Sequence, residues 1–182
     1  MQGVSFDLMR TYAIAQLGET AWAIILKSMG RPGQDYQLGE SYPDGEFAQI
    51  AMMVAQARKK SLPEVLEGFG EAMVPEMFNN YGFLVDQGWS YIDFLLNMQP
   101  MLESAFQLQA PGPAIPSRIS VTRLGPEEVS IVYESSLRAC GIVRGVCRGA
   151  AAYYRVEVDI ADEKCVLRGD PVCVISVRSR LD

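Results

Sequence analysis

The 182-residue sequence contains no histidine. Histidine is the side chain whose unperturbed pKa lies closest to neutral pH, and it is the commonest protein ligand for metal ions. Its absence excludes catalysis by a Ser–His or Cys–His pair, and the chain has neither a Ser-x-x-Lys motif nor a glycine-rich phosphate loop. We therefore expect a protein that is not an enzyme.

The sequence also lacks an excess of positive charge, and it lacks long apolar runs. The chain has 16 basic and 22 acidic residues, which gives a net charge of −6. Nucleic acid is therefore not an expected partner, because proteins that bind it gain most of their affinity by neutralising phosphates. No segment has the roughly 20 apolar residues needed to cross a bilayer, and the first residues do not resemble a signal peptide. We expect a cytoplasmic protein without a membrane partner.

Cysteines are few, and all four lie between residues 140 and 173. In a reducing compartment they are expected to be free thiols or metal ligands rather than disulfides. Cys140 and Cys147 lie seven residues apart, about 10.5 Å along a helix, which is too far to share one tetrahedral ion. Cys165 and Cys173 become neighbours if their segments pair. These two and Cys140 predict three metal ligands, with Asp162 or Cys147 as the fourth; alternatively, the cysteines are buried, reduced side chains.

The first 106 residues predict a lobe built only of helices. Apolar side chains recur there with helical spacing rather than with the alternation of strands. Ser61 with Glu64, and Ser90 with Asp93, have the spacing of the capping boxes that start helices, and Pro100 should interrupt the last helix. The predicted helices cover residues 4–17, 21–29, 46–60, 62–78 and 91–106.

Residues 107–117, with three prolines, predict a linker to an α/β lobe at 118–182. Alternating segments predict an antiparallel sheet, and one long helix is expected between its strands. The fold class is therefore α+β, with both lobes forming one domain. The predicted strands are 118–124, 129–135, 155–160, 164–167 and 172–178, and the predicted helix is 136–153.

Gly141, Gly145 and Gly149 recur every four residues in the predicted helix and leave one face without side chains. Each glycine costs about 1 kcal/mol of helix stability relative to alanine, so a close neighbour is expected to compensate. The neighbour is either another helix or strand, or a flat ligand lying on that face.

Taken together, these features resemble one known family. The start Met-x-Gly-Val-x-Phe, the helices, the proline-bearing linker and Tyr133-x-Ser135 before a glycine-rich helix resemble the haem nitric oxide/oxygen binding (H-NOX) domain of bacteria and of soluble guanylate cyclase. The pattern around Cys165, Gly169, Asp170 and Cys173 is also similar to vinyl-reductase-type domains.

The resemblance implies a haem between the lobes, with its iron bound by a histidine on the last helix of the first lobe. Leu102 stands at the position of that histidine, and Met98, one turn earlier on the same face, is a potential substitute ligand. No tyrosine stands at Ile142 to bond oxygen. The family's distal wall, carried over in the same way, comprises Ser5, Met9, Met73, Met77 and Ile142.

The family's Tyr-x-Ser-x-Arg motif, which holds the haem propionates, is matched by Tyr133 and Ser135. The arginine position is Leu137, and Arg138 lies one residue later, turned by about 100° on a helix. The family also has members with a zinc site, and Cys140, Cys165 and Cys173 match its pattern.

The sequence therefore predicts a non-enzymatic sensor of the H-NOX fold. It would bind haem, another tetrapyrrole or a flat apolar ligand between its lobes. As the resemblance implies, it would signal to a partner such as a histidine kinase or a cyclase. The alternatives are a haem-independent zinc or thiol redox sensor and an interaction module without a ligand.

Overall fold

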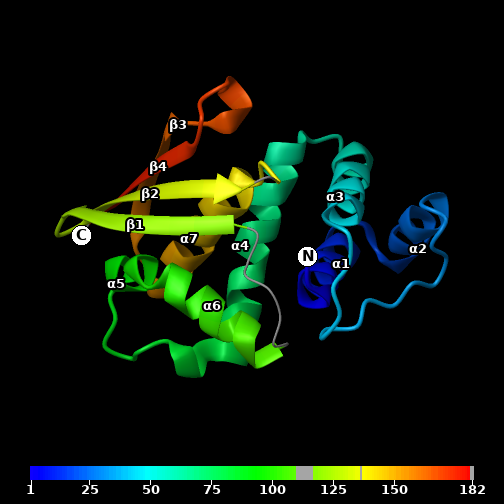
Figure 1. The fold of residues 1–182 in the computed structure, drawn as a ribbon, viewed down its shortest axis with the longest axis horizontal. Helices are drawn as coiled ribbons and strands as arrows, with labels where there is room; N and C mark the ends of the chain where they lie inside the picture. The colour runs from blue at the N-terminus through cyan, green and yellow to red at the C-terminus, as the bar shows by residue number, and fades with distance from the viewer. Residues whose placement is uncertain (110–116, 136, 181–182) are drawn as a thin grey trace.

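The computed structural model describes residues 1–109, 117–135 and 137–180, apart from the side chains of residues 106, 108, 109 and 117. It has the predicted α+β architecture, with helices first and then a four-stranded antiparallel sheet with one long helix (Figure 1). The helices are α1 (Gly3–Leu17), α2 (Glu19–Ser28), α3 (Asp44–Arg58), α4 (Leu62–Tyr81), α5 (Tyr91–Leu96), α6 (Met98–Gln109) and α7 (Cys140–Tyr154), with short 3-10 helices η1 (Gly82–Leu84) and η2 (Val166–Arg168).

Both predicted capping boxes are present. At the start of α4 the backbone N–H of Ser61 donates to the Glu64 carboxylate at 2.9 Å, and Ser61 Oγ accepts from the Glu64 N–H. Ser90 and Asp93 repeat the arrangement at α5. Each box satisfies donors that the first helical turn leaves unpaired, which fixes where the helix starts.

The helix predicted at 91–106 is interrupted, as expected, but the break lies one turn before Pro100. α5 ends at Leu96 and α6 begins at Met98, so Pro100 lies in the first turn of α6. A proline ring clashes with the carbonyl four residues earlier, here that of Leu96, which is where α5 stops. Asn97 joins the two helices, and its side-chain amide donates to the Asp93 carbonyl at 2.8 Å.

The strands are β1 (Ser117–Gly125), β2 (Glu128–Ser135), β3 (Glu157–Lys164) and β4 (Cys173–Arg180), in the order β1-β2-β4-β3. The predicted strand at 164–167 is wrong. β3 continues to Lys164 and the chain then turns through η2, because Gly169 adopts a left-handed φ of 96° and the Asp170 carboxylate accepts from the Cys165 N–H at 2.7 Å. The helix predicted at 136–153 begins later, at Cys140, and ends at Tyr154.

One face of the sheet is buried under helices. Along β2 and β4 buried side chains alternate with more exposed ones, and the buried set is Val129, Ile131, Tyr133, Cys173, Ile175, Val177 and Ser179. Helices α5, α6 and α7 contact the strands from this side (Figure 1). The sheet therefore follows the pattern of an antiparallel sheet with one covered face.

Helix α4 lies between helices α1–α3 and the half of the molecule that contains the sheet (Figure 1). Its residues belong to two hydrophobic cores. Its first half packs with α1, α2 and α3, where Val65 and Phe69 are buried, whereas Val74 in its second half belongs to the core under the sheet. The linker predicted at 107–117 falls largely on residues 110–116, which are outside the described residues, and residues 107–109 end α6. The division into lobes at that stretch stays a prediction.

The three glycines of α7 face α4, so the neighbour predicted for them is a helix. A Cβ at Gly145 would overlap the Glu67 carbonyl oxygen and lie 2.7 Å from the Glu71 nitrogen, and one at Gly141 would lie 2.8 Å from the Pro63 carbonyl. Gly70 of α4 meets the Ile142 carbonyl in the same way. The alternative prediction of a flat ligand on this face is therefore wrong, because the α4 backbone fills the space next to the glycines.

Among the residues that the structure describes, no helix combines the length and the apolar character needed to cross a bilayer.

Candidate functional site

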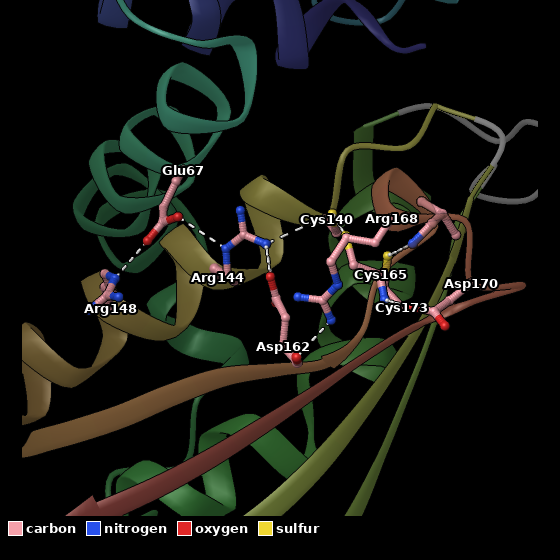
Figure 2. Close-up of polar contacts among 10 residues, drawn as sticks. Glu67, Cys140, Arg144, Arg148, Asp162, Cys165, Arg168, Asp170 and Cys173 are labelled. Carbon is pink, nitrogen blue, oxygen red and sulfur yellow. Dashed lines mark hydrogen bonds and ion pairs between the residues drawn. The ribbon is translucent and has the colours of Figure 1, made fainter.

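Three cysteines from three different elements meet at one end of the sheet (Figure 2). Cys140 opens α7, Cys165 follows β3 directly, and Cys173 opens β4. Their sulfurs all lie within 4.8 Å of one another, with 3.7 Å between those of Cys140 and Cys165, and all three side chains are buried. The predicted three-cysteine group is therefore assembled in the fold.

The loop between β3 and β4 positions two of these sulfurs. The Asp170 carboxylate accepts the Cys165 N–H, and the Cys165 carbonyl accepts the Asp170 N–H at 3.2 Å. The Val166 N–H donates to Cys173 Sγ at 3.5 Å.

Burial opposes ionisation of the Cys140 thiol until a cation compensates. Desolvation, followed by the neighbouring Cys173 and Cys165, raises the pKa of the Cys140 thiol to about 12. Metal ions reverse this preference, because they bind thiolates and release the protons. Three buried thiols at these separations fit a thiophilic ion such as zinc, for which Zn–S bonds are about 2.3 Å.

Of the two side chains predicted as a fourth ligand, neither joins the group. Cys147 is buried and lies outside the cluster, so this prediction is wrong, as the seven-residue spacing from Cys140 explains. Asp162 on β3 is also outside the cluster, and its carboxylate pairs with Arg144 instead.

Arg144 on α7 joins the cysteine site to α4 (Figure 2). Its Nε donates to Glu67 at 3.0 Å, and its Nη1 donates to the two Asp162 carboxylate oxygens at 2.9 and 3.2 Å. Arg148 binds the other Glu67 oxygen at 2.7 Å. Burial opposes ionisation of Glu67, but its hydrogen bonds with Arg148 and Arg144 hold the pKa of the carboxyl below its usual value.

Arg144 belongs to no motif that the sequence shows. The signal that could have found it is its position one turn after Cys140, because residues four apart share a helix face. Its partner Glu67 is 77 residues away in sequence and belongs to another helix, so no local pattern pairs the two.

The predicted haem-contacting residues of α6 lie in the core under the sheet. Met98 is buried, and Leu102, one turn later, is partly buried against the same core, which also contains Tyr133. Leucine offers no donor atom to iron, so these residues do not fit a haem bound through a histidine. The Met98 thioether is the one potential soft ligand predicted on this face.

The predicted propionate clamp lies directly beside the cysteines. Tyr133 is buried and is the cross-strand partner of Cys173. Ser135 Oγ accepts the Leu137 N–H at 3.2 Å, whereas Arg138 is exposed with a left-handed φ of 50°. The clamp and the cysteines are separate features in the sequence, but in the structure Tyr133 and Cys173 share one end of the buried sheet face.

The predicted distal-wall residues are spread over both cores. Met9 is fully buried in the core of α1–α3, while Met73 and Ile142 pack against both cores, and Ser5 is partly buried on α1. Met77 borders a shallow apolar cleft between α4, α5 and α6. The cleft is lined by Met77, Phe78, Tyr81, Leu84, Val85, Phe94 and Met101.

The fold and site together define a class: an α+β domain in which a helical half and a sheet half share one long helix, with a buried three-cysteine group under the sheet. The chain belongs to the Haem-NO-binding family, whose model matches residues 2–162. This confirms the resemblance seen in the sequence. A search of curated proteins finds no match.

Several solved H-NOX structures share the fold along their whole length. An H-NOX protein from Shewanella oneidensis in its Fe(II)NO state is similar, with a TM-score of 0.90, 20% identity and full coverage of both chains. An oxygen-binding H-NOX domain related to soluble guanylate cyclases has a TM-score of 0.84 at 15% identity, covering 100% of this chain and 96% of that one. An H-NOX mutant from T. tengcongensis has a TM-score of 0.82 at 18% identity, covering 99% and 97%. At such identities the likeness shows the fold alone.

Proposed function

We propose that this chain is a non-enzymatic sensor domain whose input is a metal ion or the redox state at Cys140, Cys165 and Cys173. The observation that carries the proposal is the convergence of three buried sulfurs within 4.8 Å of one another. The lack of any histidine adds support, because it removes the iron ligand that the family resemblance implies. When bound, zinc would supply a cross-link between α7, β3 and β4.

Zinc retention tests this proposal. Protein loaded with one equivalent of zinc and passed through metal-free buffer should retain one ion per chain, as measured by elemental analysis. Cys165→Ala should lose it, because two sulfurs do not hold zinc against dilution. Cys147→Ala is the matched control, since it removes a buried thiol outside the cluster and should retain the ion. Failure of the unmodified chain to retain zinc would contradict the proposal, as would equal loss in both variants.

A second candidate input is haem, another tetrapyrrole or a flat apolar ligand bound between the lobes. It is favoured by the apolar, methionine-rich surroundings of Met98 and Leu102. Titration with haemin should then give a saturable Soret shift, which Met98→Leu should alter if the thioether binds iron. Absence of saturable binding would rule out the haem form of this candidate.

In either case the output would be a contact with a signalling protein, such as the histidine kinase or cyclase that the resemblance implies. Helix α4 is suited to carry the change, because it packs against α7 and belongs to both cores.

A further inference from the structure

The guanidinium of Arg144 lies between a cysteine sulfur and a carboxylate (Figure 2). Its Nη1 is 4.0 Å from Cys140 Sγ and 2.9 Å from the nearer oxygen of Asp162. Arg144 follows Cys140 by one turn on α7, so both side chains emerge on the same face of the helix. A single cationic nitrogen therefore contacts a predicted metal ligand and the carboxylate that could complete its coordination.

The cysteine group needs one more ligand for a tetrahedral ion. Zn–S bonds of about 2.3 Å and Zn–O bonds of about 2.1 Å require a ligating carboxylate oxygen to lie within roughly 4.4 Å of each sulfur. Among the described residues, the group of ligand atoms within 4.8 Å of one another contains three sulfurs and no carboxylate oxygen. Asp162 is thus close to the site through Arg144 but is not part of it.

We propose that Arg144 controls the fourth coordination position: it holds Asp162 away from the three sulfurs, and a metal ion takes Asp162 as its fourth ligand only when the carboxylate leaves the guanidinium. The inference rests on the proposed metal input at the same cysteines and adds to it a competition between a cationic side chain and a metal cation for one carboxylate. No covalent step is involved, since only hydrogen bonds and coordination bonds exchange.

The second partner of Arg144, Glu67, connects the competition for Asp162 to helix α4. Its Nε binds Glu67 on α4, while its Nη1 binds Asp162 on β3, so the residue bridges the helix and the sheet. When Asp162 turns to the metal, Arg144 keeps Glu67 and the link between β3 and α4 is broken. Metal occupancy is thereby passed to the helix that both cores share.

The test compares zinc affinity in four proteins, using a chromophoric chelator as competitor. Arg144→Met, which keeps the apolar stem, should bind zinc about tenfold more tightly than the unmodified chain. Asp162→Asn should bind about tenfold less tightly, in line with the tenfold to hundredfold effects of residues around metal ligands. The double variant should match Asp162→Asn, because Arg144 acts through Asp162. Far-UV circular dichroism is recorded for each protein to check that it is folded.

Arg148→Met is the matched control. Arg148 binds the same Glu67 carboxylate, and its contacts include neither Asp162 nor Cys140 among those that the structure describes, so zinc affinity should change less than twofold. Titration with Co²⁺ gives a second readout, since the visible spectrum should differ between Asp162→Asn and the unmodified chain if the carboxylate is a ligand.

The outcomes separate this inference from the function on which it rests. If no variant binds zinc or Co²⁺, the proposed metal input fails and the inference fails with it. If zinc binds but Arg144→Met changes affinity equally with and without Asp162, or weakens it, the inference alone is overturned. A gain for Arg148→Met as large as that for Arg144→Met would also overturn it, because the effect would then be one of net charge.

Discussion

Gly145 has no side chain, and this allows helices α7 and α4 to approach each other closely. Its Cα faces the Glu67 carbonyl of α4, and a methyl group there would overlap that oxygen. The cost that glycine carries inside a helix, about 1 kcal/mol, is thus offset by backbone contact between α7 and α4. Such contacts also allow weak Cα–H···O bonds.

Gly145→Ala is expected to lower the free energy of unfolding by about 3 kcal/mol, although alanine is the better helix former, because the overlap is with backbone that cannot turn aside. Urea denaturation followed by circular dichroism measures the change. Gly45→Ala in α3 is the control: it has open space around the new methyl and should stabilise the protein by about 0.5 to 1 kcal/mol. A stabilising Gly145→Ala would show that α4 and α7 do not pack in this way.

At the scale of elements, the pairing of α4 with α7 depends on charge as well as on glycine. Glu67 receives hydrogen bonds from Arg144 and Arg148 across the interface, at 3.0 and 2.7 Å. These bonds, acting against the cost of burial, hold the pKa of the Glu67 carboxyl below its usual value. A lowered pKa in the folded state means that the stabilisation is present above the unfolded-state pKa of about 4.3 and is lost as pH falls through the folded-state value.

Glu67→Gln should therefore destabilise the protein at pH 7, by about 1 kcal/mol because the site is partly exposed to solvent. The variant should also lose less stability than the unmodified chain between about pH 5 and pH 3. Thermal unfolding across this range measures both effects. Glu76→Gln, which removes an exposed carboxylate from the same helix, is the matched control. Parallel acid profiles for Glu67→Gln and the unmodified chain would contradict the assignment.

The elements themselves were largely predictable from sequence where the signal is local. A capping box involves only two side chains that are three residues apart, so it can be recognised from local sequence. The predicted N-caps Ser61 and Ser90 are therefore confirmed. The turn after β3 was not, because Cys165 and Val166 have strand-forming composition, and the loop shape depends on Asp170 and on the positive φ of Gly169. Pro100 indicated a break, but its effect falls on the residue four positions earlier.

The site was predictable only in its chemistry. The group of Cys140, Cys165 and Cys173 was predicted, and the structure brings their sulfurs together, but Cys147 was also left open as a fourth ligand and lies outside the cluster. The partner of the glycine face and the partners of Arg144 were not predictable, since Glu67 reaches α7 from more than 70 residues away. Tertiary contacts of this kind leave no periodic trace in the sequence.

At the scale of the whole molecule, α4 makes two cores into one cooperative unit. Its first half is buried with α1–α3 and its second half under the sheet. Neither core can lose α4 without exposing the other, and domains built this way commonly unfold in one step.

Two tryptophans test this cooperativity, because each reports on one core. Trp22 is buried among α1–α3, and Trp89 packs against the core under the sheet. In Trp22→Phe and Trp89→Phe, urea unfolding followed by fluorescence should coincide, within each variant, with unfolding followed by circular dichroism. Fluorescence midpoints that differ from the circular dichroism midpoint would show instead that the cores unfold separately.

The strand order has a consequence for synthesis of the chain. β4 lies between β2 and β3 in the sheet. Tyr133 of β2 therefore cannot pair with Cys173 of β4 until the ribosome has added 40 more residues. At about 5 to 20 residues per second, the inner edge of β2 stays open for roughly 2 to 8 seconds on the ribosome. During that time Val129 and Ile131, which end fully buried, lack their neighbouring strand. Slow codons between residues 136 and 172 would therefore lengthen an aggregation-prone interval without changing a single amino acid.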